Sequence, residues 1–439
     1  MKYFISLLTL LMIATGVFAQ EQWTLLQCID YAHEHNIMIQ QYELSTHYQE
    51  NQLQQSKYNR LPNLSANVSQ GVNFGRSLTI DNTYESITSA STGLSASTNV
   101  LLWQGGTLRN AIMQNEYGVK SSFEDLQKAK DDVALNITAA YLDILFAREL
   151  LLVAEKQAEQ TQSQLNRSTQ LVDAGSLPQG ALLEIEAQLA REQLEMVNSE
   201  NQLRLATLVL AQMLELDSYN DFSIVQPVFP ELRAQMSIME SEEVYEKALQ
   251  NRPEIKRAAY QLESTKVQLD IAKGSLYPTL SASAGIYDDY LNTSAREVTG
   301  FFDQLADNHR ESLGLNLSIP IFSRFSNRTN IDNARLQIEN QKLEVESVKK
   351  ELRRQIEQAQ INAVAALKRY TANKTAVKSM QESLRYIEEK YNVGRVNPVE
   401  YNNAKTNLAI AESNLLQAKY DFIFRSKILD FYNGTPIEL

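Results

Sequence analysis

The clearest structural signal in the chain lies in residues 312–322, which read Ser-Leu-Gly-Leu-Asn-Leu-Ser-Ile-Pro-Ile-Phe. Apolar side chains occupy every second position from Leu313 to Ile321, and only Ser, Gly, Asn and Pro lie between them. A period of two over about ten residues predicts a β-strand with one apolar face. The segment has no charged residue, although 21% of the chain is charged.

Three further segments share this alternation and lack of charge: residues 63–74, 92–103 and 279–287. A soluble sheet usually carries charge on its wet face, whereas the polar positions here are mainly Ser, Asn and Gly. We therefore interpret the four segments as strands of a transmembrane β-barrel, and a soluble β-sandwich packed on helices is the alternative. Aromatic residues near the segment ends are placed for the membrane interfaces: Phe74, Trp103, Tyr287 and Phe322.

The strands lie within a tandem duplication. A motif recurs with the same spacing, first as Lys57, Pro62, Leu64, Ser65 and Ala66 and then as Lys273, Pro278, Leu280, Ser281 and Ala282. Further on, Trp103 matches Phe322 and Gly175 matches Gly394. We expect a first repeat over 20–216 with strands in 62–103, a connector over 217–240, and a second repeat over 241–439 with strands in 278–322.

Each repeat is predicted to hold one helix, two strands and two long helices. The helices are expected at 22–60, 105–172 and 180–216, and again at 241–275, 326–392 and 398–433. A helix over 105–172 would be about 100 Å long, which no globular domain of this size requires. After each glycine turn an apolar or aromatic residue recurs every seven positions, and this heptad ladder predicts coiled-coil packing. Its members are Leu182, Leu189, Met196, Leu203 and Leu210, then Tyr401, Leu408, Leu415, Phe422 and Leu429.

Four strands cannot close a barrel, and an open sheet edge in lipid leaves backbone groups without partners. Several copies must therefore share one barrel. Two copies would give eight strands, an interior that side chains fill, whereas three would give twelve and leave a passage. The same assembly would gather the long helices into a hollow bundle.

The remaining composition narrows the class of protein. Residues 1–19 combine Lys2, an apolar run and a terminal small residue, which predicts a secretory signal cleaved after Ala19. A formal net charge of −12 argues against nucleic acid as a partner. The single cysteine, Cys28, excludes a disulfide framework within the chain and is expected in the core.

At this point the chain resembles the TolC-type outer-membrane efflux proteins. The resemblance rests on the duplicated element order, the proline-bounded strands and two glycine turns, 173–178 and 391–398, the second of which reads Tyr-Asn-Val-Gly-Arg-Val-Asn-Pro. It implies an α+β membrane protein: a homotrimer with a twelve-stranded β-barrel in the outer membrane, surrounded by lipid, and an α-barrel of coiled-coil helices in the periplasm. It further implies an exit duct for efflux or type I secretion, opened at the helix tips and joined to a periplasmic adaptor and an inner-membrane transporter.

The resemblance also implies site residues. The adaptor would meet the two tips, at Gly175, Ser176 and Leu177 and at Val393, Gly394, Arg395 and Val396. A reversal between long helices needs a left-handed residue in any case, so these glycines could serve the turn alone. Glu400 and Asn403 match the family's acidic aperture, although only the first keeps the acid, and a Glu in a first helical turn also suits the helix dipole. The family's closing bridge is not clearly kept, because Ala181 and Val396 stand at its positions.

No catalytic constellation and no cofactor or metal site is predicted. His33 and His35 are two apart on a helix and so point to different faces. Asp288 and Asp289 are expected in a solvated external loop. A passive channel is therefore the leading interpretation, with a non-conducting periplasm-spanning scaffold or tether as the alternative. An adaptor with a coiled-coil hairpin fits less well, because it would have one hairpin and soluble β-modules.

Overall fold

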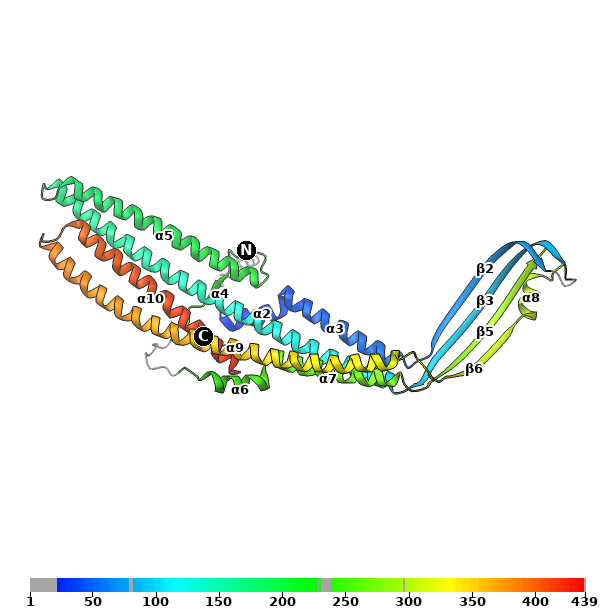
Figure 1. Cartoon of the computed structure of the whole chain (residues 1–439). Coiled ribbons are helices and arrows are strands. Elements are labelled where there is room, and N and C mark those ends of the chain that lie inside the picture. Colours follow the sequence, from blue (N-terminus) through cyan, green and yellow to red (C-terminus); the bar gives the residue numbers. More distant parts are fainter. Residues whose placement is uncertain (1–21, 79–81, 228, 230–237, 295–296, 438–439) are drawn as a thin grey trace, which may run out of the picture. The chain divides into compact units, whose positions relative to one another are not determined.

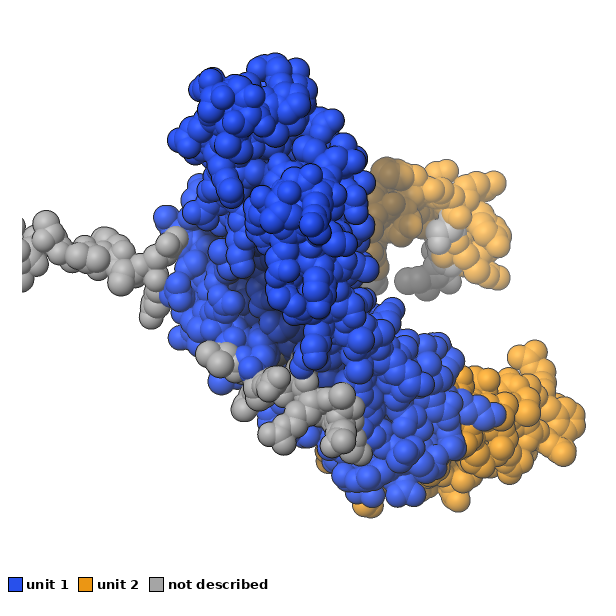
Figure 2. Space-filling view, turned by 90° about the vertical axis from the view of Figure 1, so that its left-hand side faces the viewer, with its two compact units in different colours: residues 1–43, 125–255, 348–439 blue, residues 44–124, 256–347 orange. Residues whose placement is uncertain are grey.

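The computed structural model describes residues 22–78, 82–227, 229, 238–294 and 297–437. The predicted signal segment, 1–19, lies outside these residues. The described chain falls into two compact units, one of residues 1–43, 125–255 and 348–439 and the other of residues 44–124 and 256–347. Figure 2 shows the two units in separate colours, and each is described by itself below.

The long helices agree with the expected ranges to within three residues (Figure 1). Helix α4 spans Thr107–Asp173 and α9 spans Ser326–Asn392, and each has 67 residues. Helix α5 spans Gln179–Met213 and α10 spans Pro398–Tyr432, and each has 35 residues. Equal lengths in equivalent positions are what a duplicated sequence produces. None of the helices in the described part of the chain has an apolar run long enough to cross a membrane.

The helix expected at the start of each repeat is broken in two, so the continuous helices predicted over 22–60 and 241–275 are wrong. Helices α2 (Leu25–His35) and α3 (Ile37–Tyr58) are separated by Asn36, and α6 (Ser241–Asn251) and α7 (Pro253–Gly274) by Arg252. Arg252 precedes a proline, which disfavours a helical conformation and leaves it extended at ψ 132°. Asn36 is also extended, and its Oδ1 accepts from the Met38 amide at 3.0 Å to start the next helix.

The four predicted strand segments form one antiparallel sheet in the second unit. Its order is β2 (Asn63–Leu78), β3 (Tyr84–Gln104), β5 (Thr279–Thr293) and β6 (Arg310–Ser318). Within the described residues β2 and β6 are the edge strands, so the sheet is open in a single chain.

The pairing register separates the two faces as the alternation predicts. On one face Ala66 pairs with Ala96, which pairs with Ile286, and the neighbouring residues on this face are mostly apolar. On the other face Ser65, Ser97, Gly285 and Ser312 lie side by side across the four strands. No described residue covers the apolar face at Leu313, whose side chain is 90% exposed.

Strand ends differ from the predicted ones. Strand β5 continues to Thr293 and includes Asp288 and Asp289, so the external loop expected for these residues is wrong. Strand β6 ends at Ser318, because Pro320 has no amide hydrogen to donate to a ladder. Phe322 therefore lies beyond the strand. Helix α8 (Phe301–Asp307), between β5 and β6, has no counterpart in the predicted elements.

The first unit is held by a core around α2 and α4. Cys28 is 0% exposed and packs there with Ile137, Tyr141 and Leu145, as expected for a small core residue. Strand β1 (Gln22–Trp23) pairs in parallel with β4 (Ser223–Ile224) beside this core, and the Tyr141 hydroxyl donates to the Val225 carbonyl at 2.6 Å. Part of the predicted connector, 217–240, is therefore packed structure.

Candidate functional site at the paired helical tips

The turns between α4 and α5 and between α9 and α10 share one backbone conformation. Gly175 and Gly394 both have φ +72°, the left-handed region that glycine enters without strain. The Ser176 amide donates to the Leu171 carbonyl at 2.8 Å, and the Arg395 amide donates to the Lys390 carbonyl at 2.9 Å. These are the crossed bonds of a Schellman turn, which ends a helix at a glycine.

The tips differ at the start of the returning helix. The α10 N-cap is Asn397, whose Oδ1 accepts from the Glu400 amide at 2.8 Å, and Pro398 occupies the first turn. The α5 N-cap is Pro178, which makes no side-chain capping bond. The second tip is therefore held by local chemistry that the first tip lacks.

The two tips lie at the same end of the first unit (Figure 1). Residues from both tips line a cavity of about 830 Å³ between the two hairpins. Three of the seven predicted adaptor-contact residues, Leu177, Gly394 and Val396, line this cavity. The structure leaves the other four at the exposed surface of the turns: Gly175, Ser176, Val393 and Arg395. The first tip therefore presents glycine backbone and a small hydroxyl outward, and the second presents an apolar side chain and a positive charge.

Two tyrosines of the second hairpin form a wall of the cavity. The Tyr391 and Tyr401 rings stack with centroids 4.8 Å apart and planes 13° from parallel. Gln164 on α4 donates to the Tyr391 hydroxyl at 3.5 Å, which links the two hairpins. Burial raises the pKa of Tyr401 to about 12, and the nearby Glu388, Tyr391 and Glu192 raise it in the same direction.

A buried lysine joins the hairpins next to the cavity. Lys405 on α10 is 7% exposed, and its Nζ donates to Thr161 Oγ1 on α4 at 2.5 Å. The same Nζ lies 3.5 Å from Oε1 of Glu192 on α5, which is 8% exposed and also accepts from Gln188 at 2.8 Å. Burial lowers the pKa of Lys405, and the Glu192 carboxylate opposes that effect. One ammonium group thus connects three helices.

Sequence reasoning missed Lys405 and Glu192. The available signal was a charge on the buried face of a heptad ladder: Lys405 lies four residues after Tyr401 and three before Leu408, so it shares their side of α10. Glu192 lies three residues after Leu189 in the same way.

Glu400 and Asn403 both lie on the exposed surface of α10, outside the residues that line the cavity. Their spacing of three places them on one side of the helix. Glu400 is in the first turn, so the helix-dipole role also fits. Ala181 and Val396 line the cavity, and neither side chain can form the ion pair that the family places there.

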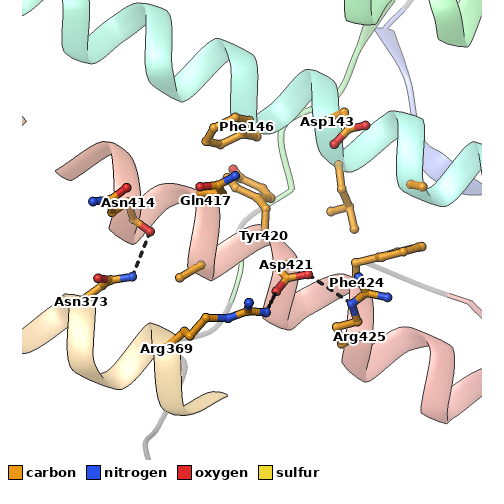
Figure 3. Close-up of a pocket in the computed structure, with 13 residues that line it drawn as sticks. Asp143, Phe146, Arg369, Asn373, Asn414, Gln417, Tyr420, Asp421, Phe424 and Arg425 are labelled. Carbon is orange, nitrogen blue, oxygen red and sulfur yellow. Dashed lines mark hydrogen bonds and ion pairs between the residues drawn. The ribbon is translucent and has the colours of Figure 1, made fainter. Parts of the chain in front are cut away.

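A second groove, of about 670 Å³, lies between α4, α9 and α10 (Figure 3). Arg369 on α9 and Arg425 on α10 both donate to Asp421, and Asn373 donates to the Asn414 carbonyl at 3.2 Å. The Arg369 and Asn373 bonds tie α9 to α10 on one side of the groove, whereas the Arg425 bond lies within α10. On the opposite side α4 contributes Phe146 and also Asp143, whose pKa burial raises.

A further contact near this groove fastens the second hairpin to the first. Glu149 on α4 accepts from Lys419 Nζ at 2.8 Å and from the Tyr420 hydroxyl at 2.6 Å. Burial raises the pKa of Tyr420, and the hydrogen bond to Glu149 raises it further. The hairpins are thus joined by polar contacts at two levels, near the tips and near the middle of the unit.

The four aromatic residues predicted at the membrane interfaces do not all lie on one face of the sheet. Phe74 lies on the apolar face of β2, and Trp103, which pairs with Leu280 after a bulge, lies on that face of β3. The register places Tyr287 with Ser95 and Arg310 on the polar face, against the expectation for that residue. Its ring lies over Gly285, where an added Cβ would meet the hydroxyl at 2.7 Å.

Comparisons with known proteins agree with this architecture. The model of the outer membrane efflux protein family matches residues 28–215 and 244–433. The outer membrane efflux protein BepC of Brucella suis is 22% identical over 333 residues, which are 75% of this chain and 69% of BepC. TolC of Escherichia coli is 24% identical over 323 residues, which are 70% of this chain and 62% of TolC.

The solved structure of the outer membrane protein VceC from Vibrio cholerae has the same fold, with a TM-score of 0.74. The superposition covers 94% of this chain and 96% of VceC at 15% sequence identity. The family description names efflux rather than a catalysed reaction. The expected resemblance is confirmed, and the chain belongs to the outer membrane efflux protein family.

Proposed function

We propose that three copies of this chain form a passive exit duct, with a shared twelve-stranded barrel in the outer membrane and a helical tunnel in the periplasm. The observation that carries this proposal is the open four-stranded sheet with one apolar and one polar face. Its two edge strands have backbone groups that need partners in lipid. A second and a third copy supply these partners by joining β6 of one chain to β2 of the next.

The polar face suits the wall of a water-filled bore. Where Ser65, Ser97 and Ser312 lie side by side, this face consists of small uncharged side chains. Small hydroxyls keep the bore wide and hydrated, and they bind no cargo class strongly. Selectivity for cargo therefore belongs to an inner-membrane transporter, which this duct reaches through a periplasmic adaptor that contacts the two exposed tips.

Opening takes place at the periplasmic tips. The second hairpin moves away from the first, and this movement breaks the contacts that Lys405 makes with Thr161 and Glu192 and that Tyr391 makes with Gln164. Each turn is closed by the hydrogen bond that follows its glycine. The adaptor can therefore displace a whole hairpin by binding its tip.

Glu400 lines the narrowest opening in the closed trimer, where threefold symmetry repeats its carboxylate as a ring that attracts cations. Its exposure and its position beside Asn403 support this assignment. Replacing Glu400 with Gln should weaken the preference for cations, or the block by multivalent cations, in single-channel recordings. Unchanged selectivity would place this residue away from the aperture and leave it with the helix-dipole role.

The duct is tested by purifying the detergent-extracted protein and recording it in planar lipid bilayers. Stepwise conductance from a cross-linked trimer is the expected result. The matched variants are Leu315→Asp, on the apolar face of β6, and Asn316→Asp, on its polar face. The first should abolish membrane assembly because it places a charge in lipid, and the second should assemble and conduct. A trimer that gives no channel events, even with Lys405 or Glu400 replaced, would favour the non-conducting tether.

A further inference from the structure

Helix α8 continues the edge of the sheet where β6 is missing. Strand β6 pairs with β5 only as far as Tyr287, although β5 continues to Thr293. Beyond that point the Gln304 side chain accepts from the Leu291 amide at 3.0 Å and donates to the Leu291 carbonyl at 3.1 Å. Asn308 donates to the Asp289 carbonyl at 2.6 Å. Two side-chain amides thus replace the backbone of the absent strand.

These contacts hold a helix that would not form alone. It has seven residues, and helices this short are unstable without tertiary contacts. Gln304 is 8% exposed and also donates to the Thr299 carbonyl at 2.9 Å, so it is bonded on both sides. The orientation of α8 on β5 is therefore defined, and so is the direction in which its aromatic residues face.

The aromatic residues of α8 lie on the apolar side of the sheet. Tyr290 follows Ile286 by four residues in an unbroken register, so both side chains are on the apolar face. The Phe301 and Tyr290 rings meet edge to face with their centroids 4.9 Å apart, and the centroids of the Phe301 and Phe302 rings are 5.4 Å apart. Phe302 is 81% exposed, so the part of the chain that the structure describes leaves most of its ring uncovered.

We propose that Tyr290, Phe301 and Phe302 form an interfacial anchor that sits in the headgroup layer of the lipid bilayer at the end of the sheet away from α9. This inference rests on the proposed membrane function of the sheet. The occupant is lipid, because the cluster lies on the same face of the sheet as the apolar side chains that the proposed barrel turns outward. Aromatic rings prefer the boundary between hydrocarbon and water.

Charged groups mark where that boundary lies. On the same face, Glu311 pairs with Ile286, and the Asp288 carboxylate accepts from His309 at 2.7 Å. These carboxylates lie between the apolar positions of β5 and β6 and the aromatic cluster. They exclude the hydrocarbon from this level, so the rings beyond them reach headgroups rather than acyl chains. Because it faces lipid, α8 does not close the exit of the bore.

The test uses nitroxide labels on single cysteines. The native Cys28 is 0% exposed, and burial raises its pKa to about 12, so it does not react with the label. Labels are placed through Phe302→Cys, Leu315→Cys for the middle of the apolar face, and Ser95→Cys for the polar face. The trimer is reconstituted in phosphatidylcholine and phosphatidylglycerol vesicles, and collision rates with oxygen and with a water-soluble nickel chelate report the depth of each label.

The expected order of the oxygen-to-nickel collision ratio is Leu315→Cys highest, Phe302→Cys intermediate and Ser95→Cys lowest. A Phe302→Cys label as wet as Ser95→Cys, while Leu315→Cys remains in lipid, overturns the anchor but leaves the barrel intact. A low ratio at Leu315→Cys instead overturns the proposed function. A Phe302→Cys label shielded from both reagents shows burial against a second copy and also overturns the anchor.

A second variant tests the edge contact. Adding Gln304→Ala to Phe302→Cys removes the amide that holds α8 on β5, so the label should become more mobile and its collision ratio should fall toward the Ser95→Cys value. Adding Asp303→Asn instead is the control. The Asp303 side chain is exposed, and it is not one of the two side chains whose bonds to β5 are described above. Equal behaviour of the two variants would contradict the role of Gln304.

Discussion

The two hairpins of the first unit have the same length and turn but differ in chemistry. Both turn at a glycine with φ +72°, and the helices that follow have 35 residues each. Counted from these glycines, the position of the buried Lys405 is occupied in the first hairpin by Glu186, which is exposed. Duplication therefore preserved the backbone but not the side chains: the ammonium groups that join the hairpins, Lys405 and Lys419, lie on the second, and the carboxylates that they meet, Glu192 and Glu149, lie on the first.

The largest effect is expected from Lys405→Met. Removing the ammonium leaves the Glu192 carboxylate buried without its cation, which costs about 3–5 kcal/mol. Thermal or denaturant unfolding of the purified protein should show a large loss, and conductance recordings should show more frequent opening.

Glu186→Gln, at the equivalent position of the first hairpin, is the control and should change neither quantity. The double variant Lys405→Met with Glu192→Leu removes both charges and should recover much of the stability. If Lys405→Met alone unfolds like the native chain, the buried pair does not hold the hairpins together.

The next effect is expected at the glycine turns. A Cβ at Gly175 or Gly394 would meet nothing within 4 Å, so the only cost of alanine is the left-handed backbone, about 1–2 kcal/mol. Both alanine variants should therefore lose the same stability in unfolding experiments, and Gly394→Asn should lose less. Unequal losses for the two alanine variants would show that the tips differ in backbone as well as in side chains.

A smaller effect separates the two N-caps. Asn397→Ala removes the bond to the Glu400 amide and should cost about 1 kcal/mol. Pro178→Ala removes no side-chain cap, so it should cost less, and Pro178→Ser can add the missing cap and stabilise the first hairpin. Unfolding midpoints of the three variants check this order. If Asn397→Ala leaves the unfolding midpoint unchanged, the N-cap bond does not make the second tip more stable than the first.

At neutral pH the smallest effect is expected from Tyr401, because its contribution appears only as a pH dependence in alkaline solution. The pKa of Tyr401 is about 12 in the folded chain, against about 10 for an exposed tyrosine. Between these values the unfolded chain releases the proton and the folded chain keeps it, so stability falls as pH rises from about 10 to about 12. Tyr401→Phe should reduce this slope in alkaline unfolding experiments. Tyr386→Phe, an exposed tyrosine on α9, should leave the slope unchanged.

Much of the fold followed from local patterns. The charge-free alternation located all four strands, because a period of two is a property of neighbouring residues. The long helices were placed because few breakers interrupt them. The breaks at Asn36 and Arg252 were missed, although Pro253 was a local signal for the second. Helix α8 was missed because its stability comes from the hydrogen bonds that Gln304 and Asn308 make to β5, not from the helix propensity of its seven residues.

The candidate site was predicted less completely. The tip glycines were recognised because a left-handed residue between two helices has a sequence signature. The partners Lys405, Thr161 and Glu192 were not, because they are separated by up to 244 positions in the chain. A pattern on one helix shows that a lysine faces inward, but it cannot show which acid lies opposite.

Alternation, repeats and helix breaks are local, so the sequence alone sufficed for the strands, the long helices, the two turns and the membership of the family. Pairing is not local. Only the folded chain shows that Tyr287 lies on the polar face, that Tyr290 lies on the apolar face with Phe301, and that one lysine joins three helices. These facts depend on register and on contacts between distant segments, which a single pattern along the chain does not encode.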